Sequence, residues 1–218
     1  MSGDCQEDRK KLMMNERFGL WTFILFAFLG MLIPMQWSGA ILAGGGSRRF
    51  GQDKALYVYK GKPLIVWVMD SLAEASECFV VSNRVYSGLG PVYHDLKRGG
   101  DTLSGLHSGL THAKQDWVAV AACDQPFLSR DFWRYMLRQI TPDAQAVVAA
   151  SGNFFEPLGG LYHKSLEPEV LRRLEARQLK MQALLHSIPH VALDKTELES
   201  RFGSYLFLNA NHPGDLPL

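Results

Sequence analysis

Short apolar runs alternate with amphipathic stretches along the chain from residue 37 onward. Apolar runs of strand length predict buried strands, and apolar residues three or four positions apart predict helices. The alternation predicts an α/β fold: a three-layer, mostly parallel sheet with helices on both faces and right-handed, Rossmann-like crossovers. The predicted strands are 39–43, 78–82, 91–95, 116–124, 144–150, 191–193 and 205–208, with a short extended piece at 55–59 and a loop and further strand within 154–163. The predicted helices are 64–75, 102–113, 130–140, 165–176 and 182–188.

Two of these elements contain distinctive residues. The strand at 116–124 is apolar on both faces, as a central parallel strand is, and it ends abruptly in Cys123-Asp-Gln-Pro126. Ser129 is a favourable N-cap for the helix that follows. In the helix at 102–113, Gly105 and Gly109 lower helix stability but allow close packing or close approach of a ligand.

The first 36 residues are predicted to be an extension to one folded domain at 37–218. Within them, residues 18–35 are uncharged and apolar, close to the minimum of about 17 residues that spans a membrane. Basic residues flank the stretch on both sides, so the positive-inside rule gives no orientation. Four interpretations stay open: a start codon set too early or a non-essential tail, a membrane anchor, a signal peptide, and a packed helix.

Composition narrows the class of protein. A chain of 218 residues with 47% hydrophobic residues can bury the core of one α/β domain, and a net charge of +1 gives no electrostatic reason to expect nucleic-acid binding. Cys5, Cys78 and Cys123 form no CxxC pair, which indicates a reducing compartment. We therefore expect a cytoplasmic protein, tethered to a membrane only if 18–35 is a true anchor. No zinc site is expected. His186 and His190 are four residues apart, but Pro189 lies between them and would break a helix that aligned them.

Polar residues and glycines follow four of the predicted strands. They are the glycines at 44–46, Asn83, Asp95 and Asp124. Ligands of parallel α/β sheets bind beyond the carboxyl ends of the strands. These residues are therefore predicted to form one site at that edge of the sheet.

The glycine-rich segment after the first strand is suited to binding phosphates, because glycine lets the backbone approach them and the following cations supply positive charge. It is not a P-loop, since Gln52 and Asp53 follow Gly51 where Lys and Ser or Thr would stand. It is not a dinucleotide-binding GxGxxG, since Arg49 occupies the last glycine position. What remains is the pattern L-A-G-G-x-S-x-R-F-G-x-D-K at 42–54.

This pattern closely resembles the N-terminal motif of the molybdenum cofactor guanylyltransferases, the MobA family of nucleotidyltransferases. The resemblance extends over nearly all of 37–218. Three departures are visible: a loop one residue shorter than in some members, Thr102-Leu-Ser-Gly105 in place of Pro-Leu-Ala-Gly, and an N-terminal extension without an expected counterpart. The further matching segments are Gly61-Lys-Pro-Leu64, Val80-Val-Ser-Asn-Arg84, Asp95, Leu103-Ser-Gly105, Cys123-Asp-Gln-Pro126 and Phe207-Leu-Asn-Ala-Asn-His-Pro213.

The resemblance implies a nucleotidyltransferase that moves GMP from magnesium-GTP to the terminal phosphate of molybdopterin and releases pyrophosphate. It implies catalytic roles for Lys54, Arg49 and Asp124. It also implies that Lys54 and Arg49 contact the triphosphate, and that Asp124 binds Mg²⁺. Leu42, Ala43, Gly44 and Gly45 would contact the nucleotide, the first three at guanine and ribose, and Asn83 and Asp95 would contact the nucleoside. Asn209 and Asn211 would lie near the active site. Molybdoenzymes or their chaperones are candidate protein partners.

Other functions stay open at the level of sequence. The loop of the related cytidylyltransferases typically reads L-A-A-G, and Gly44 at its third position favours guanine over cytosine. A sugar-1-phosphate nucleotidyltransferase and a nucleotide-binding regulatory module without transfer activity are the remaining alternatives. His94, His107 and His163 are interpreted as surface or packing residues, and Cys123 as a small buried apolar residue.

Overall fold

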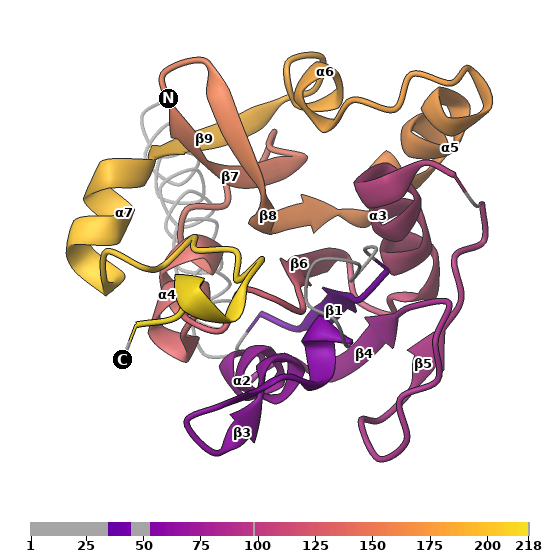
Figure 1. Cartoon of the computed structure of the whole chain (residues 1–218). Helices are drawn as coiled ribbons and strands as arrows, with labels where there is room; N and C mark the ends of the chain where they lie inside the picture. The colour runs from indigo at the N-terminus through magenta and orange to yellow at the C-terminus, as the bar shows by residue number, and fades with distance from the viewer. Residues whose placement is uncertain (1–34, 45–52, 98, 218) are drawn as a thin grey trace, which may run out of the picture. The chain divides into compact units, whose positions relative to one another are not determined.

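Seven strands within the described residues form one sheet, in the order β5-β4-β1-β6-β8-β7-β9 (Figure 1). The structure is a computed structural model and describes residues 35–44, 53–97 and 99–217. The strands are β1 Trp37–Leu42, β4 Glu77–Val81, β5 Val92–Tyr93, β6 Trp117–Ala122, β7 Ala146–Ser151, β8 Phe154–His163 and β9 His190–Asp194, while β2 Val58–Tyr59 and β3 Lys62–Pro63 form a separate hairpin.

The sheet is mostly parallel, as the alternation of elements predicts. β1 runs parallel to both β4 and β6, β4 runs parallel to β5, and β7 runs parallel to β9. β8 runs antiparallel to its neighbours β6 and β7. The carboxyl ends of β1, β4, β5 and β6 therefore meet at one edge of the sheet.

Helices cover both faces of the sheet, so the predicted three-layer arrangement is confirmed (Figure 1). One apolar core contains side chains of α2, α4 and α7, and the other contains side chains of α3, α5 and α6. Alternation along β6 feeds both cores, with Ala119 and Ala121 in the first and Val118 and Val120 in the second. The helices are α2 Leu64–Ser71, α3 Asp101–His112, α4 Arg130–Leu137, α5 Glu167–Glu175, α6 Met181–Leu185 and α7 Lys195–Phe202.

Strand β6 is the centre of the fold. All six of its residues are buried, and it pairs with β1 on one side and β8 on the other, which confirms the prediction of a central strand. The helix α4 that follows it begins at the predicted cap, because the Phe132 amide donates to Ser129 Oγ at 3.2 Å. These two elements fix both ends of the turn that contains Asp124.

The glycines of α3 bring this helix close to β1. A Cβ atom at Gly109 would lie 3.3 Å from Ala40 Cβ, and one at Gly105 would lie 2.8 Å from Leu42 Cδ1. A real Cβ does not approach another atom as closely as the second distance, so alanine at 105 would displace Leu42. The expectation of close packing at these glycines is confirmed.

The prediction of a strand at 205–208 is wrong. These residues form a turn, in which the Leu206 amide donates to Gly203 O at 3.0 Å and the Leu208 amide donates to Tyr205 O at 2.9 Å. The adjacent Leu206 and Phe207 are both buried, which a half-exposed strand does not allow. The apolar run therefore reflects burial within a turn.

Helix α7 was not predicted from the sequence. It begins where Asp194 accepts a hydrogen bond from the Glu197 amide at 2.9 Å. An acidic or hydroxyl residue with Glu three positions later is a helix-start signal, so the Asp194-Lys-Thr-Glu197 segment contained the information. Several predicted helices are also too long, since α2 ends at Ser71 and not at 75.

Residues 154–163 form one ten-residue strand and not a loop followed by a strand. Pro157, Gly159 and Gly160 belong to an irregular part of β8. The short extended piece predicted at 55–59 divides into the 3₁₀ turn Lys54–Leu56 and the strand β2. In the first case the predicted segment is more regular than expected, and in the second it is less regular.

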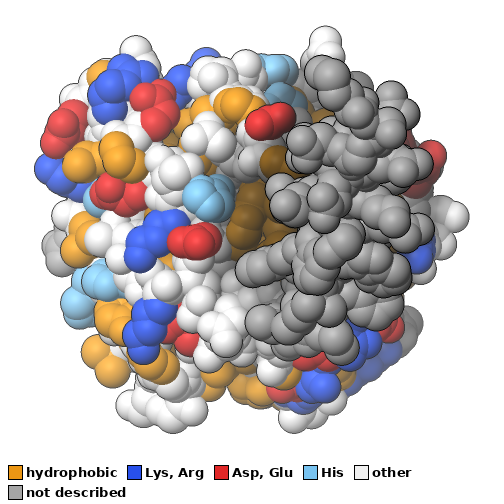
Figure 2. Space-filling view, turned by 180° about the vertical axis from the view of Figure 1, so that it is seen from behind, with side chains coloured by type: hydrophobic (Ala, Val, Ile, Leu, Met, Phe, Trp, Pro, Cys, Tyr) orange, Lys and Arg blue, Asp and Glu red, His pale blue; other side chains and the backbone are white. Residues whose placement is uncertain are grey.

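The chain separates into two units, residues 1–35 and 36–218, and the elements above belong to the second. The predictions for 18–34 lie outside the described residues. Among the residues that are described, no helix has the length and apolar character needed to cross a membrane. Figure 2 views the molecule from behind and shows acidic and basic side chains interspersed over the described surface. This surface therefore gives no indication of a partner of one charge.

Candidate functional site

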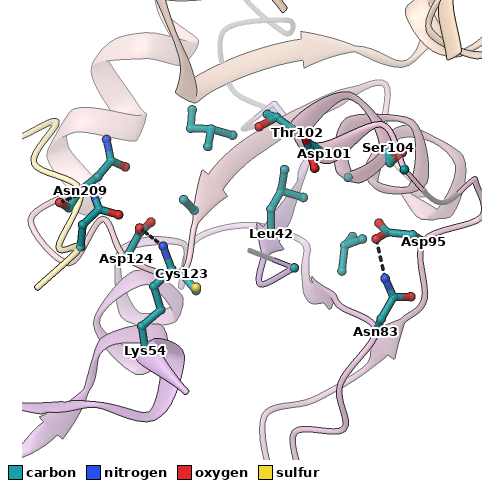
Figure 3. A pocket seen from close by; sticks show the side chains of 17 residues that line it. Leu42, Lys54, Asn83, Asp95, Asp101, Thr102, Ser104, Cys123, Asp124 and Asn209 are labelled. Atoms are coloured by element: carbon teal, nitrogen blue, oxygen red, sulfur yellow. Dashed lines mark hydrogen bonds and ion pairs between the residues drawn. The ribbon is translucent and has the colours of Figure 1, made fainter. Parts of the chain in front are cut away.

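A cavity of about 490 Å³ lies at the carboxyl edge of the sheet (Figure 3). Its walls come from the ends of β1, β4 and β6, from the first turns of α3 and from the segment after α7. This is where parallel α/β sheets bind ligands. The predicted site residues among its lining are Leu42, Gly44, Lys54, Asn83, Asp95, Asp124, Asn209 and Asn211.

Lys54 and Asp124 form an ion pair at one end of the cavity (Figure 3). Lys54 Nζ donates to Asp124 Oδ2, and the Asp124 side chain is only 6% exposed. The two residues are 70 positions apart, and the parallel pairing of β1 with β6 brings their segments together. A cation and a carboxylate held side by side in a cavity can bind a phosphate group and a divalent cation, respectively.

Asp53 holds Lys54 in place. It caps the 3₁₀ turn Lys54–Leu56 by accepting from the Ala55 amide at 3.1 Å. Its other carboxylate oxygen accepts from the Tyr86 hydroxyl at 3.0 Å and lies 2.9 Å from the Arg84 guanidinium. Burial, followed by this hydrogen bond to Asp53, raises the pKa of Tyr86, so the phenol stays protonated and donates. Asp53 thus ties the lysine turn to the loop after β4.

The Asn209-Ala-Asn211 segment is attached to the same end of the cavity. The Ala210 amide donates to the backbone oxygen of Asp124 at 2.9 Å, and Ala210 is completely buried. This contact places Asn209 and Asn211 on either side of a residue fixed to Asp124. Both amides line the cavity, and Figure 3 shows Asn209 beside Asp124.

The opposite end of the cavity holds a second polar pair. Asn83 Nδ2 donates to Asp95 Oδ2 at 2.8 Å, which joins the ends of β4 and β5 (Figure 3). Ser82 fixes the turn before Asn83, since its hydroxyl donates to Ala43 O at 2.8 Å and accepts from the Arg84 amide at 3.0 Å. This end offers mainly hydrogen-bond acceptors, namely the carboxylate of Asp95 and the amide oxygen of Asn83.

Three predicted site residues are not placed in the cavity lining. Ala43 is buried in the core between sheet and helices, and its amide donates to Val81 O at 2.9 Å. Its side chain points away from the cavity because successive residues of a strand alternate between faces, and Leu42 takes the cavity side. Gly45 and Arg49 lie outside the described residues, so their predicted roles stay predictions.

The first turn of α3 also lines the cavity, and sequence reasoning did not assign it to the site. Asp101, Thr102 and Ser104 lie along this wall (Figure 3). Asp101 has φ of +46°, a left-handed conformation that only Gly, Asn and Asp adopt with any frequency. No periodicity or motif reveals a single left-handed residue. The strand-end rule could not find it, because it begins a helix.

Gly100 is required for the turn that presents Asp101. Its amide donates to Ser104 Oγ at 2.9 Å. A Cβ at this position would lie 2.3 Å from Leu174 Cδ2 and 2.5 Å from Ser104 Oγ, so no larger residue fits without rearrangement. The turn is therefore packed tightly between α3 and α5.

Cys123 lines the cavity but is not a nucleophile. Burial, and then the neighbouring charge of Asp124, raise the pKa of its thiol to about 12, so the reactive thiolate is scarce at neutral pH. The interpretation of Cys123 as a buried apolar residue is confirmed. His107 is a packing residue as predicted, since it is buried and its Nε2 lies 2.8 Å from Glu167 Oε1.

The cavity offers one carboxylate beside a lysine for a metal ion. Among the described residues, no group of three or more His, Cys, Asp or Glu side chains is arranged to hold a metal. A single carboxylate such as that of Asp124 is nevertheless suited to Mg²⁺. This ion keeps several waters and is commonly bound by one or two carboxylates together with substrate phosphates. Asp124 as a magnesium ligand stays a prediction.

A mostly parallel sheet with a cation–carboxylate pair and carboxamides at its carboxyl edge is the arrangement of an α/β protein suited to chemistry at phosphate. The family model described as the MobA-like NTP transferase domain matches residues 39–191. The chain belongs to this family of nucleotidyltransferases.

Curated relatives have more specific names. A protein of Deinococcus radiodurans named "Probable molybdenum cofactor guanylyltransferase" is 35% identical over 190 residues, which cover 85% of this chain and 93% of the relative. The molybdenum cofactor guanylyltransferase of Vibrio vulnificus is 33% identical over 192 residues, covering 85% and 96%. Among solved structures, molybdopterin-guanine dinucleotide biosynthesis protein A of Archaeoglobus fulgidus has the same fold, with a TM-score of 0.68, 24% identity, and coverage of 82% of this chain and 94% of that one.

Proposed function

We propose that this chain transfers GMP from GTP to the molybdenum cofactor. The observation that carries the proposal is the Lys54–Asp124 pair, which lies in the same cavity as Asn83 and Asp95. The family and the names of the relatives supply the reaction, and the cavity supplies a place for it. The relatives named above are guanylyltransferases, so the cytidylyl, sugar-phosphate and regulatory alternatives are not favoured.

The reaction joins two phosphates. An oxygen of the terminal phosphate of molybdopterin attacks the α-phosphorus of GTP and forms a new P–O bond. The bond from the α-phosphorus to the bridging oxygen of the β-phosphate breaks, and pyrophosphate leaves with that oxygen and its electron pair. No covalent enzyme intermediate is needed, so catalysis rests on positioning and on neutralising negative charge.

The residues at the two ends of the cavity take different parts in this proposal. Lys54 neutralises the triphosphate, and Arg49 adds a second cation from the glycine-rich segment. Asn209 and Asn211, held by the tie of Ala210 to Asp124, face the reacting phosphates. At the other end, Asn83 and Asp95 contact the nucleoside.

Asp124 would hold Mg²⁺ in this scheme. The ion would supply positive charge to the phosphate oxygens of the nucleotide. Lys54 pairs with Asp124 before the nucleotide binds, and on binding the lysine would contact the phosphates while Asp124 would hold the ion. The ion pair therefore keeps both groups at the reaction end of the cavity in the free protein.

The nucleotide preference of the full chain tests the proposal. The acceptor-rich end at Asn83 and Asp95 suits guanine, whose pairing edge carries two donor groups, N1–H and the 2-amino group, whereas cytosine has one. We expect GTP to bind at least about tenfold more tightly than CTP in calorimetric titrations with Mg²⁺ present, since each well-made pairing is worth about 1–3 kcal/mol.

ATP serves as the control in these titrations, because it has the same triphosphate on a different purine. Equal binding of all three nucleotides would show that the cavity recognises phosphates alone. Tighter binding of CTP than of GTP would contradict the proposed base. Replacement of Asn83 by alanine should reduce the preference for GTP over CTP.

The proposal also includes a location and partners. Because GTP is supplied in the cytoplasm, we propose that the domain at 36–218 acts there, whatever the nature of 1–35. The product would be the guanine dinucleotide form of the molybdenum cofactor. We therefore propose molybdoenzymes, or the chaperones that serve them, as the proteins that receive it.

A further inference from the structure

Strands β6 and β8 separate beside the cavity, near Ala122 and Leu158. They pair antiparallel from Trp117 opposite His163 to Val120 opposite Gly160. The same register would bring Ala122 opposite Leu158, but the ladder stops before this pair. Ala122 and Leu158 both line the cavity. The two strands therefore separate beside the cavity, and each contributes one residue to its lining.

The side chain of Gln125 occupies the position between the separated strands. Its Oε1 accepts from the Ala122 amide at 3.0 Å, and its Nε2 donates to Leu158 O at 3.3 Å. These are the two groups that the continued ladder would join to each other. A carboxamide has both an acceptor and donors, as a peptide group has, so it can satisfy both strands. Gln125 is 1% exposed, so its side chain is enclosed between the two strands.

β8 is irregular at the same place. Leu161 pairs with Val147 of β7, but Glu156 pairs with Ala149, so β8 contains additional residues between these pairs. Gly159 within this bulge has φ of +82°, which favours glycine. Bulges beside active sites commonly redirect a side chain, and this one directs Leu158 into the cavity lining.

The carbonyl groups of the bulge are satisfied by side chains. The Tyr162 hydroxyl donates to Pro157 O at 2.6 Å, and Gln125 donates to Leu158 O. The backbone of Gln125 also belongs to the turn after β6, since its amide donates to Ala122 O at 3.2 Å. One residue therefore connects the bulge to the turn that contains Asp124.

We infer that Gln125 is a positioning residue for guanylyl transfer, an inference that rests on the proposed function. Its carboxamide holds the bulge of β8 away from the end of β6, keeps Leu158 in the wall of the cavity and fixes the neighbouring Asp124. Gln125 does not itself line the cavity, so it acts through these residues.

Replacement of Gln125 by methionine tests the inference. Methionine has a similar length but neither polar group, so the Ala122 amide and Leu158 carbonyl either pair and close the gap or lose their partners. Either change displaces the backbone at Ala122 and Leu158, beside Asp124. We expect kcat/KM for GMP transfer by the full chain to fall about 10- to 100-fold, mainly through kcat, because a displacement of about 1 Å has effects of this size.

Gln182 is the matched control. Its carboxamide also bonds both backbone groups of one β8 residue, accepting from the Phe155 amide at 3.0 Å and donating to Phe155 O at 2.7 Å. It does so from α6, outside the cavity lining. We expect Gln182→Met to change thermal stability but to keep kcat/KM within about twofold of the unsubstituted chain.

A second variant, Gln125→Asn, adds a readout that a general loss of stability does not move. Asparagine keeps an acceptor and donors, but its side chain is one methylene shorter, so it cannot reach the Ala122 amide and the Leu158 carbonyl at once. We expect kcat per folded protein to fall while KM for GTP stays within about twofold, because the groups that are displaced act on the reacting phosphates.

The outcomes separate the positioning role from the proposed function. Absence of transfer by the unsubstituted chain would contradict the proposed function. Transfer by that chain, with Gln125→Met as active as Gln182→Met, would overturn the positioning role. If Gln125→Met does not fold, Gln125→Asn decides: kcat and KM equal to those of the unsubstituted chain would overturn the inference, and a lower kcat with KM kept would support it.

Discussion

Replacing Asp124 with asparagine is expected to lower kcat for GMP transfer about 100- to 1,000-fold, the usual effect of removing one electrostatic stabiliser of a transition state. Asparagine keeps the size of the side chain and an oxygen that can accept from Lys54. It loses the negative charge that would hold Mg²⁺ and that pairs with the lysine. The measurement is steady-state transfer by the full chain at saturating GTP.

Asp70 provides the control for this substitution. It forms an ion pair with Lys62 on the surface, where its side chain is 49% exposed. Exposed pairs of this kind contribute about 0–1 kcal/mol, so Asp70→Asn should leave kcat within about twofold. If Asp124→Asn retained full activity, neither the metal assignment nor the role of the buried pair could be correct.

Replacing Lys54 with methionine is expected to lower kcat/KM for GTP about 100- to 1,000-fold, because the triphosphate loses a cation at the reaction end of the cavity. The same change should reduce stability, since Asp124, with 6% of its side chain exposed, would keep its charge without this partner. Breaking a buried ion pair costs about 3–5 kcal/mol, and the 18% exposure of Lys54 places the expected cost at or below the lower end.

The double variant Lys54→Met/Asp124→Asn separates the two effects. Removing both charges should restore much of the free energy of unfolding, because no unpaired charge remains, whereas transfer activity should stay as low as in the single variants. Denaturant unfolding and transfer assays on the four proteins complete the cycle. A double variant whose loss of stability equals the sum of the two single losses would contradict the coupling of Lys54 and Asp124.

The cavity could be anticipated from the sequence where a general rule of sheets applied. Asn83, Asp95 and Asp124 each follow an apolar run, and parallel strands place their carboxyl ends at one edge. Lys54 came from the glycine-rich motif. The structure brings all four to one cavity, and it adds the contacts that the motif cannot show, such as the ties from Asp53 to the loop after β4.

The residues that were missed depend on local conformation and not on periodicity. Asp101 reaches the cavity through a single left-handed φ, and Leu158 reaches it through a bulge. A loop was predicted within 154–163, but the strand continues through Pro157 and Gly159 because side chains of Gln125 and Tyr162 satisfy the irregular backbone. Such partners are more than 30 residues away in the case of Gln125, so a local pattern cannot reveal them.

The nucleotide contact predicted for Ala43 stays a prediction, but the sequence did not reveal the direction of its side chain. The motif places it beside Leu42 and Gly44 in sequence, but strand alternation directs its side chain into the core. The turn at 205–208 was mistaken for a strand for a related reason, since apolar residues in succession can be buried without an extended backbone. In both cases the composition of a segment was a correct guide to burial and a poor guide to geometry.

In the proposed reaction, GMP is joined to molybdopterin in this cavity. The most direct measurement incubates the full chain with GTP, Mg²⁺ and molybdopterin and follows the pterin by mass spectrometry together with released pyrophosphate. We expect a pterin heavier by one GMP unit, an equal amount of pyrophosphate, and loss of both with Asp124→Asn. A cytidylyl product formed faster from CTP, or no guanylyl product from a chain that binds GTP, would contradict guanylyl transfer in this cavity.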